Sequence, residues 1–81
     1  MGIKMTLTKA IQERINELAL RYDLSIYGLS KKCGVPRSTI CTIPEYRSVG
    51  LIIIYNICEG LGITLKEFFD SPLFARENLS D

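Results

Sequence analysis

Glycine and proline positions divide this chain into segments that suit short helices and little else. Gly34 and Gly62 each follow a stretch with apolar residues at helical spacing, where a residue in the left-handed conformation commonly ends a helix. Pro36 suits the start of a helix, whereas Pro44 and Pro72 end one, because proline has no N–H to donate. Within 81 residues, this pattern favours one small domain built from several short helices.

The spacing of apolar residues predicts five helices. Their predicted N-terminal caps or first residues are Thr8, Ser25, Pro36, Gly50 and Thr64, and Glu67 completes a capping box with Thr64. The third helix is expected over 36–43 and the fourth over 51–61. We expect these side chains to face inward: Ile11, Ile15, Leu18 and Tyr22; then Leu29 and Cys33; then Ile40 and Ile43; and finally Leu51, Ile54, Ile57, Cys58 and Leu61.

The predicted fold class is therefore all-α. We expect a tail over 1–7, a helical domain over 8–70 and a loose tail over 71–81, with a loop at 44–49 inside the domain. The segment 51–55 leaves an alternative open, because its β-branched and aromatic residues also favour a local strand. The apolar spacing continues in helical register to Leu61, and this favours the helix.

The composition excludes several classes of function. The chain has no His, so the usual general base and the commonest metal ligand are both missing, and we expect neither an enzyme nor a cofactor or metal site. Three cysteines form no CxxC pair, which fits a reducing cytoplasm better than a disulfide framework. The longest uncharged run, 48–58, is too short for a membrane span of about 20 residues.

Basic charge is concentrated in the middle of the chain. The net charge is only +1, but residues 25–49 contain four basic residues and one acidic residue, whereas residues 50–81 carry a net charge of −3. A basic patch on a nearly neutral domain is consistent with a polyanionic partner such as nucleic acid. On charge alone, an ordinary solvated surface is the simpler interpretation.

The block 29–43, LSKKCGVPRSTICTI, is similar to the helix-turn-helix of the lambda-repressor-like, or Cro/XRE, family. The match includes a small residue at Ser30, Gly34 at the turn, and four apolar positions at Leu29, Val35, Ile40 and Ile43. The similarity extends to INEL at 15–18 and to ICEGLGITLKEFF at 57–69. It implies a five-helix lambda-repressor-like domain over 8–70 that binds double-stranded DNA in sequence-specific fashion, typically as a repressor of transcription.

In this motif the third helix lies in the major groove. A helical wheel with Ile40 and Ile43 inward places Ser38, Cys41, Thr42 and Glu45 outward, and Arg37 beside them. The resemblance then implies base contacts from Arg37, Ser38, Cys41 and Thr42, and phosphate contacts from Thr39, Lys31, Lys32 and Arg47. Arg37 is the leading candidate because a guanidinium can bind guanine O6 and N7 with two hydrogen bonds.

The fourth helix suggests a protein partner. With its apolar stripe inward, Ile52 and Tyr55 lie on the outside, and exposed apolar clusters commonly mark interfaces. Phe68, Phe69 and Phe74 could extend such a surface, although a place in the core is the simpler interpretation for Phe68 or Phe69. Because the family commonly binds palindromic sites as dimers, we expect a homodimer through Ile52, Tyr55, Phe68 and Phe74. We expect no membrane or small-molecule substrate as a partner.

Two alternatives remain open. A protein-interaction module, or an antitoxin-like partner, could keep this fold with weak or no DNA binding. Relatives often have Gln where Ile26 stands, and a glycine-containing turn where this chain has 44–47, so both departures favour that alternative. Separately, Cys41 could make DNA binding sensitive to oxidation, although a small tolerated side chain is the simpler interpretation.

Overall fold

The chain folds into short helices. The computed structural model describes residues 4–45 and 48–80. Its α-helices are α1 (Leu7–Arg21), α2 (Ile26–Cys33), α3 (Arg37–Cys41), α4 (Leu51–Leu61) and α5 (Leu65–Phe69), and its 3-10 helices are η1 (Ile43–Glu45), η2 (Pro72–Phe74) and η3 (Arg76–Asn78). Within the described residues there is no strand beyond one isolated bridge between Met5 and Leu79. The predicted all-α class is confirmed, and the strand considered for 51–55 is wrong because this segment is helical.

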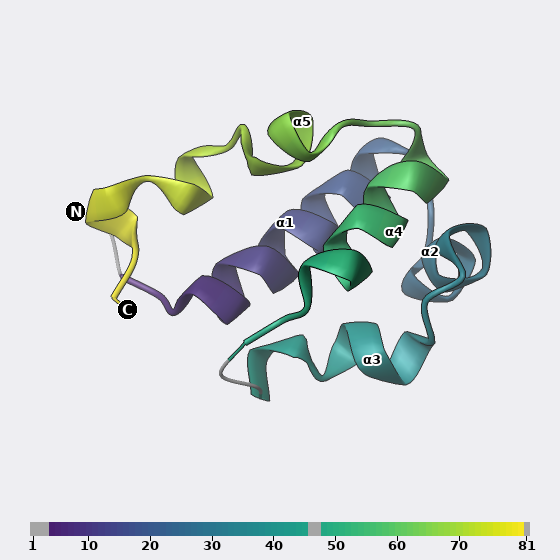
Figure 1. Cartoon of the computed structure of the whole chain (residues 1–81), viewed down its shortest axis with the longest axis horizontal. Coiled ribbons are helices and arrows are strands. Elements are labelled where there is room, and N and C mark those ends of the chain that lie inside the picture. The colour runs from purple at the N-terminus through teal and green to yellow at the C-terminus, as the bar shows by residue number, and fades with distance from the viewer. Residues whose placement is uncertain (1–3, 46–47, 81) are drawn as a thin grey trace.

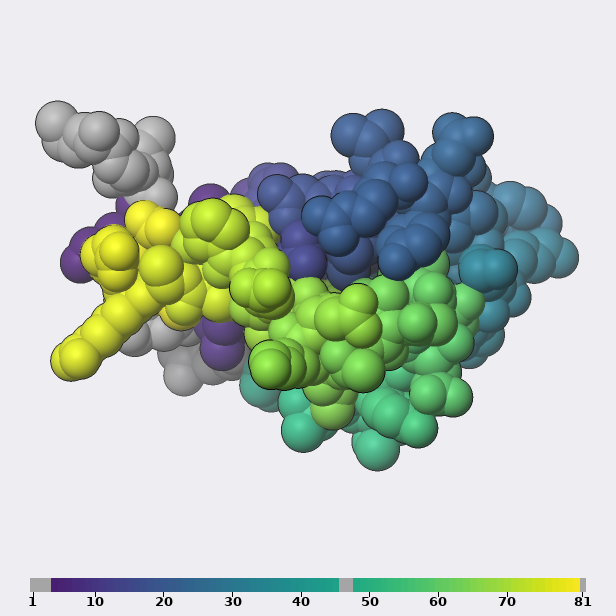
Figure 2. All heavy atoms as spheres, turned by 90° about the horizontal axis from the view of Figure 1, so that it is seen from above, coloured from purple at the N-terminus to yellow at the C-terminus, as the bar shows by residue number. Residues whose placement is uncertain are grey.

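The helices form an elongated body of 35 × 22 × 20 Å. α2 packs against both α3 and α4, α4 packs against α5, and α1 packs against η1 and η2. Figure 1 shows α2 at one end of the molecule and the two chain ends at the other. Figure 2 shows the same separation from above, with the C-terminal residues in yellow opposite the blue residues of α2. None of the helices in the described part of the chain is long and apolar enough to cross a bilayer.

A single apolar core joins all five helices. Most of the predicted inward side chains are buried in it, together with Phe68 of α5. Two predicted core residues are exposed instead: Leu51 is 63% exposed and Tyr22 is 41% exposed. Leu51 is the first residue of α4 and Tyr22 is the C-cap of α1, so both lie at helix ends that extend past the core.

The helix boundaries follow local capping. Ser25 and Thr64 are N-caps as predicted, and Thr64 forms the full capping box with Glu67. The cap of α1 is Thr6 rather than Thr8, because the Thr6 hydroxyl accepts the N–H of Lys9 at 3.2 Å. α3 is shorter than the predicted 36–43: it covers Arg37–Cys41, and the chain continues into η1, where Pro44 has no N–H for a further α-helical bond.

The C-terminal segment is ordered, so the prediction of a loose tail is wrong for 71–80. Phe74 packs against the core, with its ring centroid 4.9 Å from that of Phe69. Further along, the N–H of Met5 donates to Asn78 O at 3.1 Å, and the N–H of Ser80 donates to Met5 O at 2.9 Å. The apolar burial of Phe74 and this backbone pairing hold the segment in place, and they also order residues 4–6 of the predicted N-terminal tail.

A buried arginine holds the C-terminal end of α5. Arg14 of α1 is 4% exposed. Its Nε donates to Phe68 O at 2.7 Å, its Nη2 donates to Glu67 O at 2.8 Å and lies 3.4 Å from Asp70 O, and its Nη1 donates to Glu17 Oε1 at 3.1 Å. The last carbonyls of a helix have no partner within the helix, so the guanidinium satisfies groups that α5 leaves open.

A glycine allows α2 and α4 to approach closely. A Cβ atom added at Gly60 of α4 would lie 2.5 Å from Cys33 Sγ and 2.7 Å from Cys33 Cα. Because the second of these atoms belongs to the backbone of α2, the helices would have to move apart to admit a side chain. The position of α2 relative to the core therefore depends on Gly60.

Arg14→Met is expected to lower the free energy of unfolding by about 3 kcal/mol, because the substitution leaves the carbonyls of Glu67 and Phe68 without their hydrogen-bond donors in the folded protein. Urea denaturation followed by circular dichroism would measure this. Arg21→Met, which alters an exposed arginine on the same helix, is the matched control and should change stability by less than about 0.5 kcal/mol. Equal stability of the two variants would contradict the structural role of Arg14.

Gly60→Ala is expected to destabilise the fold by about 1–3 kcal/mol, through the clash with Cys33. Gly28→Ala provides the opposite control: the added Cβ meets only ordinary contacts, 3.4 Å from Ser25 Oγ and 3.6 Å from Leu24 Cδ2. Alanine is the better helix former, so Gly28→Ala should be stabilising by up to about 1 kcal/mol. Urea denaturation would measure the stability of both variants. A stabilising Gly60→Ala would show that α2 and α4 do not meet at this point.

Candidate nucleic-acid interface

The turn between α2 and α3 presents one face of α3 to solvent. Gly34 ends α2 in the left-handed conformation, with φ of 70°, and its N–H donates to Ser30 O at 2.9 Å. Pro36 then precedes the first residue of α3. Buried Val35 lies in the turn, and buried Leu29 and Ile40 come from the two helices. These apolar contacts set the angle between α2 and α3.

The structure exposes most of the side chains that the helical wheel places outward. Arg37, Ser38 and Cys41 are exposed, whereas Thr39 is half-buried at the side of the helix. Glu45, at the end of η1, is also exposed. Three of the four residues predicted to contact bases therefore share one accessible surface.

The fourth of them, Thr42, is half-buried and its hydroxyl already has a partner. Its Oγ1 donates to Ser38 O at 2.8 Å and lies 3.4 Å from Thr39 O. A hydroxyl has one proton, so the Thr42 hydroxyl offers a ligand mainly its lone pairs, and its methyl group offers an apolar contact. This restricts the role that sequence reasoning gave to Thr42.

Basic side chains lie beside this face. Lys31 and Lys32 are exposed in the last turn of α2, next to the turn that leads to Arg37. Neither lysine nor Arg37 takes part in the ion pairs formed among the described residues, which are Lys9–Glu13 and Arg14–Glu17 on α1. Their charge is thus available to an anionic ligand. Arg47, the remaining predicted phosphate contact, lies outside the described residues.

The three cysteines are free and differ in accessibility. Cys41 is exposed on α3, so the hypothesis of an oxidation-sensitive surface stays a prediction. Cys33 Sγ donates to Ile57 O at 3.5 Å in the contact between α2 and α4. Burial raises the pKa of the Cys33 thiol, against a smaller lowering by Lys32, and burial also raises the pKa of the Cys58 thiol. The thiols of Cys33 and Cys58 are therefore held in the neutral form. In the part of the chain that the structure describes, no group of His, Cys, Asp or Glu side chains could hold a metal ion.

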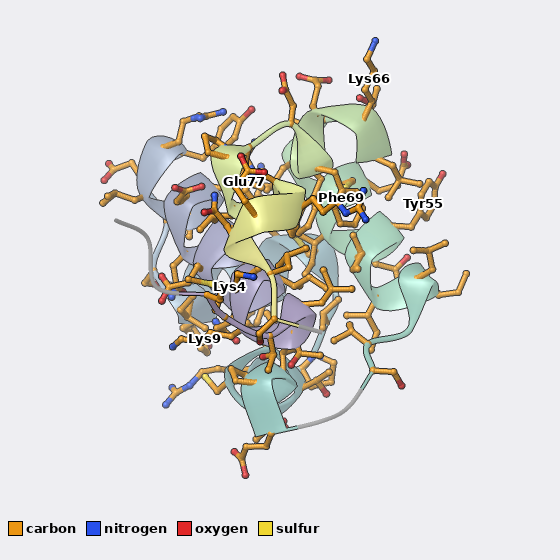
Figure 3. The ribbon with its side chains drawn as sticks, turned by 90° about the vertical axis from the view of Figure 1, so that its left-hand side faces the viewer. Lys4, Lys9, Tyr55, Lys66, Phe69 and Glu77 are labelled. Atoms are coloured by element: carbon orange, nitrogen blue, oxygen red, sulfur yellow. The ribbon has the colours of Figure 1, made fainter. Side chains whose placement is uncertain are left out.

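An apolar surface lies on α4. We define the α4 face as Leu51, Ile52 and Tyr55, which are 63%, 71% and 46% exposed. Figure 3 shows Tyr55 on the same side of the molecule as Phe69, and Lys4 and Lys9 on the opposite side.

The structure corrects the predicted interface at its two phenylalanines. Phe68 is fully buried at 0% exposure, so it cannot contact a partner, and its place among the interface residues is wrong. Phe74 is half-buried against Phe68 and Phe69, with the Phe68 ring centroid 6.3 Å away. Both side chains complete the core because the C-terminal segment folds back onto it. Ile52 and Tyr55 remain accessible as predicted.

No protein-family model, curated protein or solved structure matches this chain. Its function is therefore inferred from its own residues.

Sequence reasoning overlooked Tyr27, which is 56% exposed on α2 beside Lys31. Its position four residues before a lysine was the available signal.

Proposed function

We propose that this protein is a sequence-specific DNA-binding regulator of transcription with a five-helix, lambda-repressor-like arrangement. In this proposal α3 enters the major groove and the protein represses by occupying its site. The observation that carries it is the exposed polar face of α3 beside Lys31, Lys32 and Arg37, which form no ion pair with an acidic side chain in the described part of the chain. The order of the helices and the glycine turn between α2 and α3 support it.

Each residue predicted to contact bases has a defined task in this proposal. Arg37 donates to guanine O6 and N7, and Ser38 exchanges hydrogen bonds with a base edge. Thr42 accepts from a base amine or places its methyl against a thymine methyl, because its proton is engaged by Ser38 O. Cys41 is small enough to let the helix approach the bases closely.

Phosphate contacts position the protein without selecting a sequence. We assign them to Lys31, Lys32, Thr39 and Arg47. The two lysines extend from the end of α2, so they would meet the backbone on one side of the groove that α3 occupies.

We further propose that the protein acts as a homodimer through Ile52 and Tyr55 of the α4 face. α4 has no basic residue, and Glu59 is its one charged side chain, so this helix is unsuited to DNA and suited to an apolar partner. A two-fold axis here brings the same surface of both copies together and presents two α3 helices to the two halves of a palindromic site.

A protein-interaction module is the second candidate, and the position of Ile26 favours it. This side chain is half-buried and packs against the core, so at the start of α2 it offers no polar group to a phosphate. The two candidates differ in their response to salt, since only phosphate contacts release counterions.

Selection from a random duplex library is expected to enrich a palindromic sequence. Arg37→Ala should weaken binding of that sequence by roughly 5- to 100-fold, which corresponds to the loss of one bidentate base contact. Fluorescence anisotropy at two salt concentrations would measure it, with Arg76→Ala on η3 as the control. No enrichment, together with binding that disappears at physiological salt, would contradict DNA recognition and favour the interaction module.

Ile52→Asp is expected to convert a dimer into a monomer at high micromolar concentration, because a carboxylate cannot be buried unpaired in an apolar contact. Sedimentation equilibrium without DNA would measure the mass. Leu20→Asp on α1 is the matched control, since Leu20 is 82% exposed and lies outside the α4 face. A monomeric parent protein under these conditions would rule out the dimer.

A further inference from the structure

A tyrosine and a lysine are paired on the outer face of α2. Tyr27 is 56% exposed, and the Nζ atom of Lys31 lies 5.4 Å from the centroid of its ring. The two residues are one helical turn apart, so their side chains are neighbours on the helix surface. An ammonium above the face of an aromatic ring is attracted by the electron density of the ring.

This pair does not contribute to the core. The inner face of α2 consists of Leu29, which is buried, and of Ile26 and Cys33, which pack against the core from the side. Tyr27 and Lys31 point away from these residues. α2 has no acidic residue, so Lys31 has no partner for an ion pair within this helix.

The pair places two hydrogen-bond donors, the Lys31 ammonium and the Tyr27 hydroxyl, at neighbouring positions on the helix surface. The ammonium of Lys31 carries charge and three N–H groups, and the hydroxyl of Tyr27 is a neutral donor at the far edge of the same ring. Contact with the ring restricts the Lys31 side chain before any ligand binds, so less conformational entropy is lost on binding. The ligand that fits such a pair is an oxyanion with two accessible oxygens.

We propose that Tyr27 and Lys31 together bind one phosphate of the DNA backbone. This inference rests on the proposed function and extends the interface from the end of α2 by one further helical turn. Lys31 binds one non-bridging oxygen, and the Tyr27 hydroxyl donates to the other. The polar contact that Ile26 cannot make is thus supplied by its neighbour. The pair strengthens binding to every sequence alike, because a phosphate carries no sequence information.

Tyr27→Phe is the central test, since it removes the hydroxyl and keeps the ring under Lys31. On the selected duplex it should weaken binding about 10- to 100-fold at every salt concentration, as expected for loss of a hydrogen bond to a charged group. Lys31→Met should instead reduce the slope of log affinity against log salt by about 0.9, because one phosphate contact is lost. Neither variant should change the preferred sequence.

Tyr22→Phe and Lys66→Met are the matched controls. Tyr22→Phe removes a tyrosine hydroxyl at the exposed end of α1, and Lys66→Met removes an exposed lysine charge on α5. Circular dichroism of each variant verifies folding, and both controls should bind like the parent.

The outcomes separate the two proposals. If the parent binds its selected site and Tyr27→Phe binds equally well, the phosphate pair is wrong while DNA recognition stands. If Tyr27→Phe weakens binding to one sequence and not to others, Tyr27 reads a base and the phosphate assignment is likewise overturned. If the parent enriches no sequence and shows no salt-dependent binding, both proposals fail together.

Discussion

The arrangement of this small domain depends on the burial of one guanidinium. Arg14 lies inside the body of the protein, where a charge is costly unless its donors are all directed at acceptors. α5 supplies these acceptors with the carbonyls at its C-terminal end, and Glu17 supplies a carboxylate. The requirement fixes α5 against α1. It also places Phe68 in the core and directs the following residues back along α1, so that Phe74 can pack beside it.

The candidate interface depends on a second constraint, the close contact between α2 and α4. Gly60 and Cys33 meet without room for another carbon atom, and this contact holds α2 on the core while its outer face stays open. α3 follows through the turn at Gly34, with Ile40 as its buried anchor. Only Ile40 of α3 is buried, so most of the surface of this short helix is available to a ligand.

The surface of the molecule is divided by chemistry in a way that suits two different partners. The end formed by α2 and α3 presents lysines, Arg37 and a tyrosine, without a neutralising acid on either helix. The α4 face presents large apolar side chains and no basic residue. Polyanions are bound by charge and by directed donors, whereas an apolar face is stabilised only by removal from water. The proposed DNA contact and the proposed dimer contact therefore require no residue in common.

Local features of the sequence were sufficient to predict the helices, because capping, helical spacing and proline act within a few residues of one another. Ser25, Gly34 and the Thr64–Glu67 capping box were identified in this way, and so was the outward position of Ser38 and Cys41 on α3. A core position for Phe68 was one of two interpretations that the sequence left open. The position of Phe74, the order of the C-terminal segment and the role of Arg14 could not be predicted. The role of Arg14 depends on contacts with residues more than fifty positions away in the sequence. The position of Phe74 depends on a reversal of the chain. Neither kind of contact leaves a periodic signal in the sequence. The sequence by itself determined which segments are helical and which faces are apolar. Only the tertiary structure decided which apolar and charged side chains are enclosed, because burial depends on how the helices close around one another.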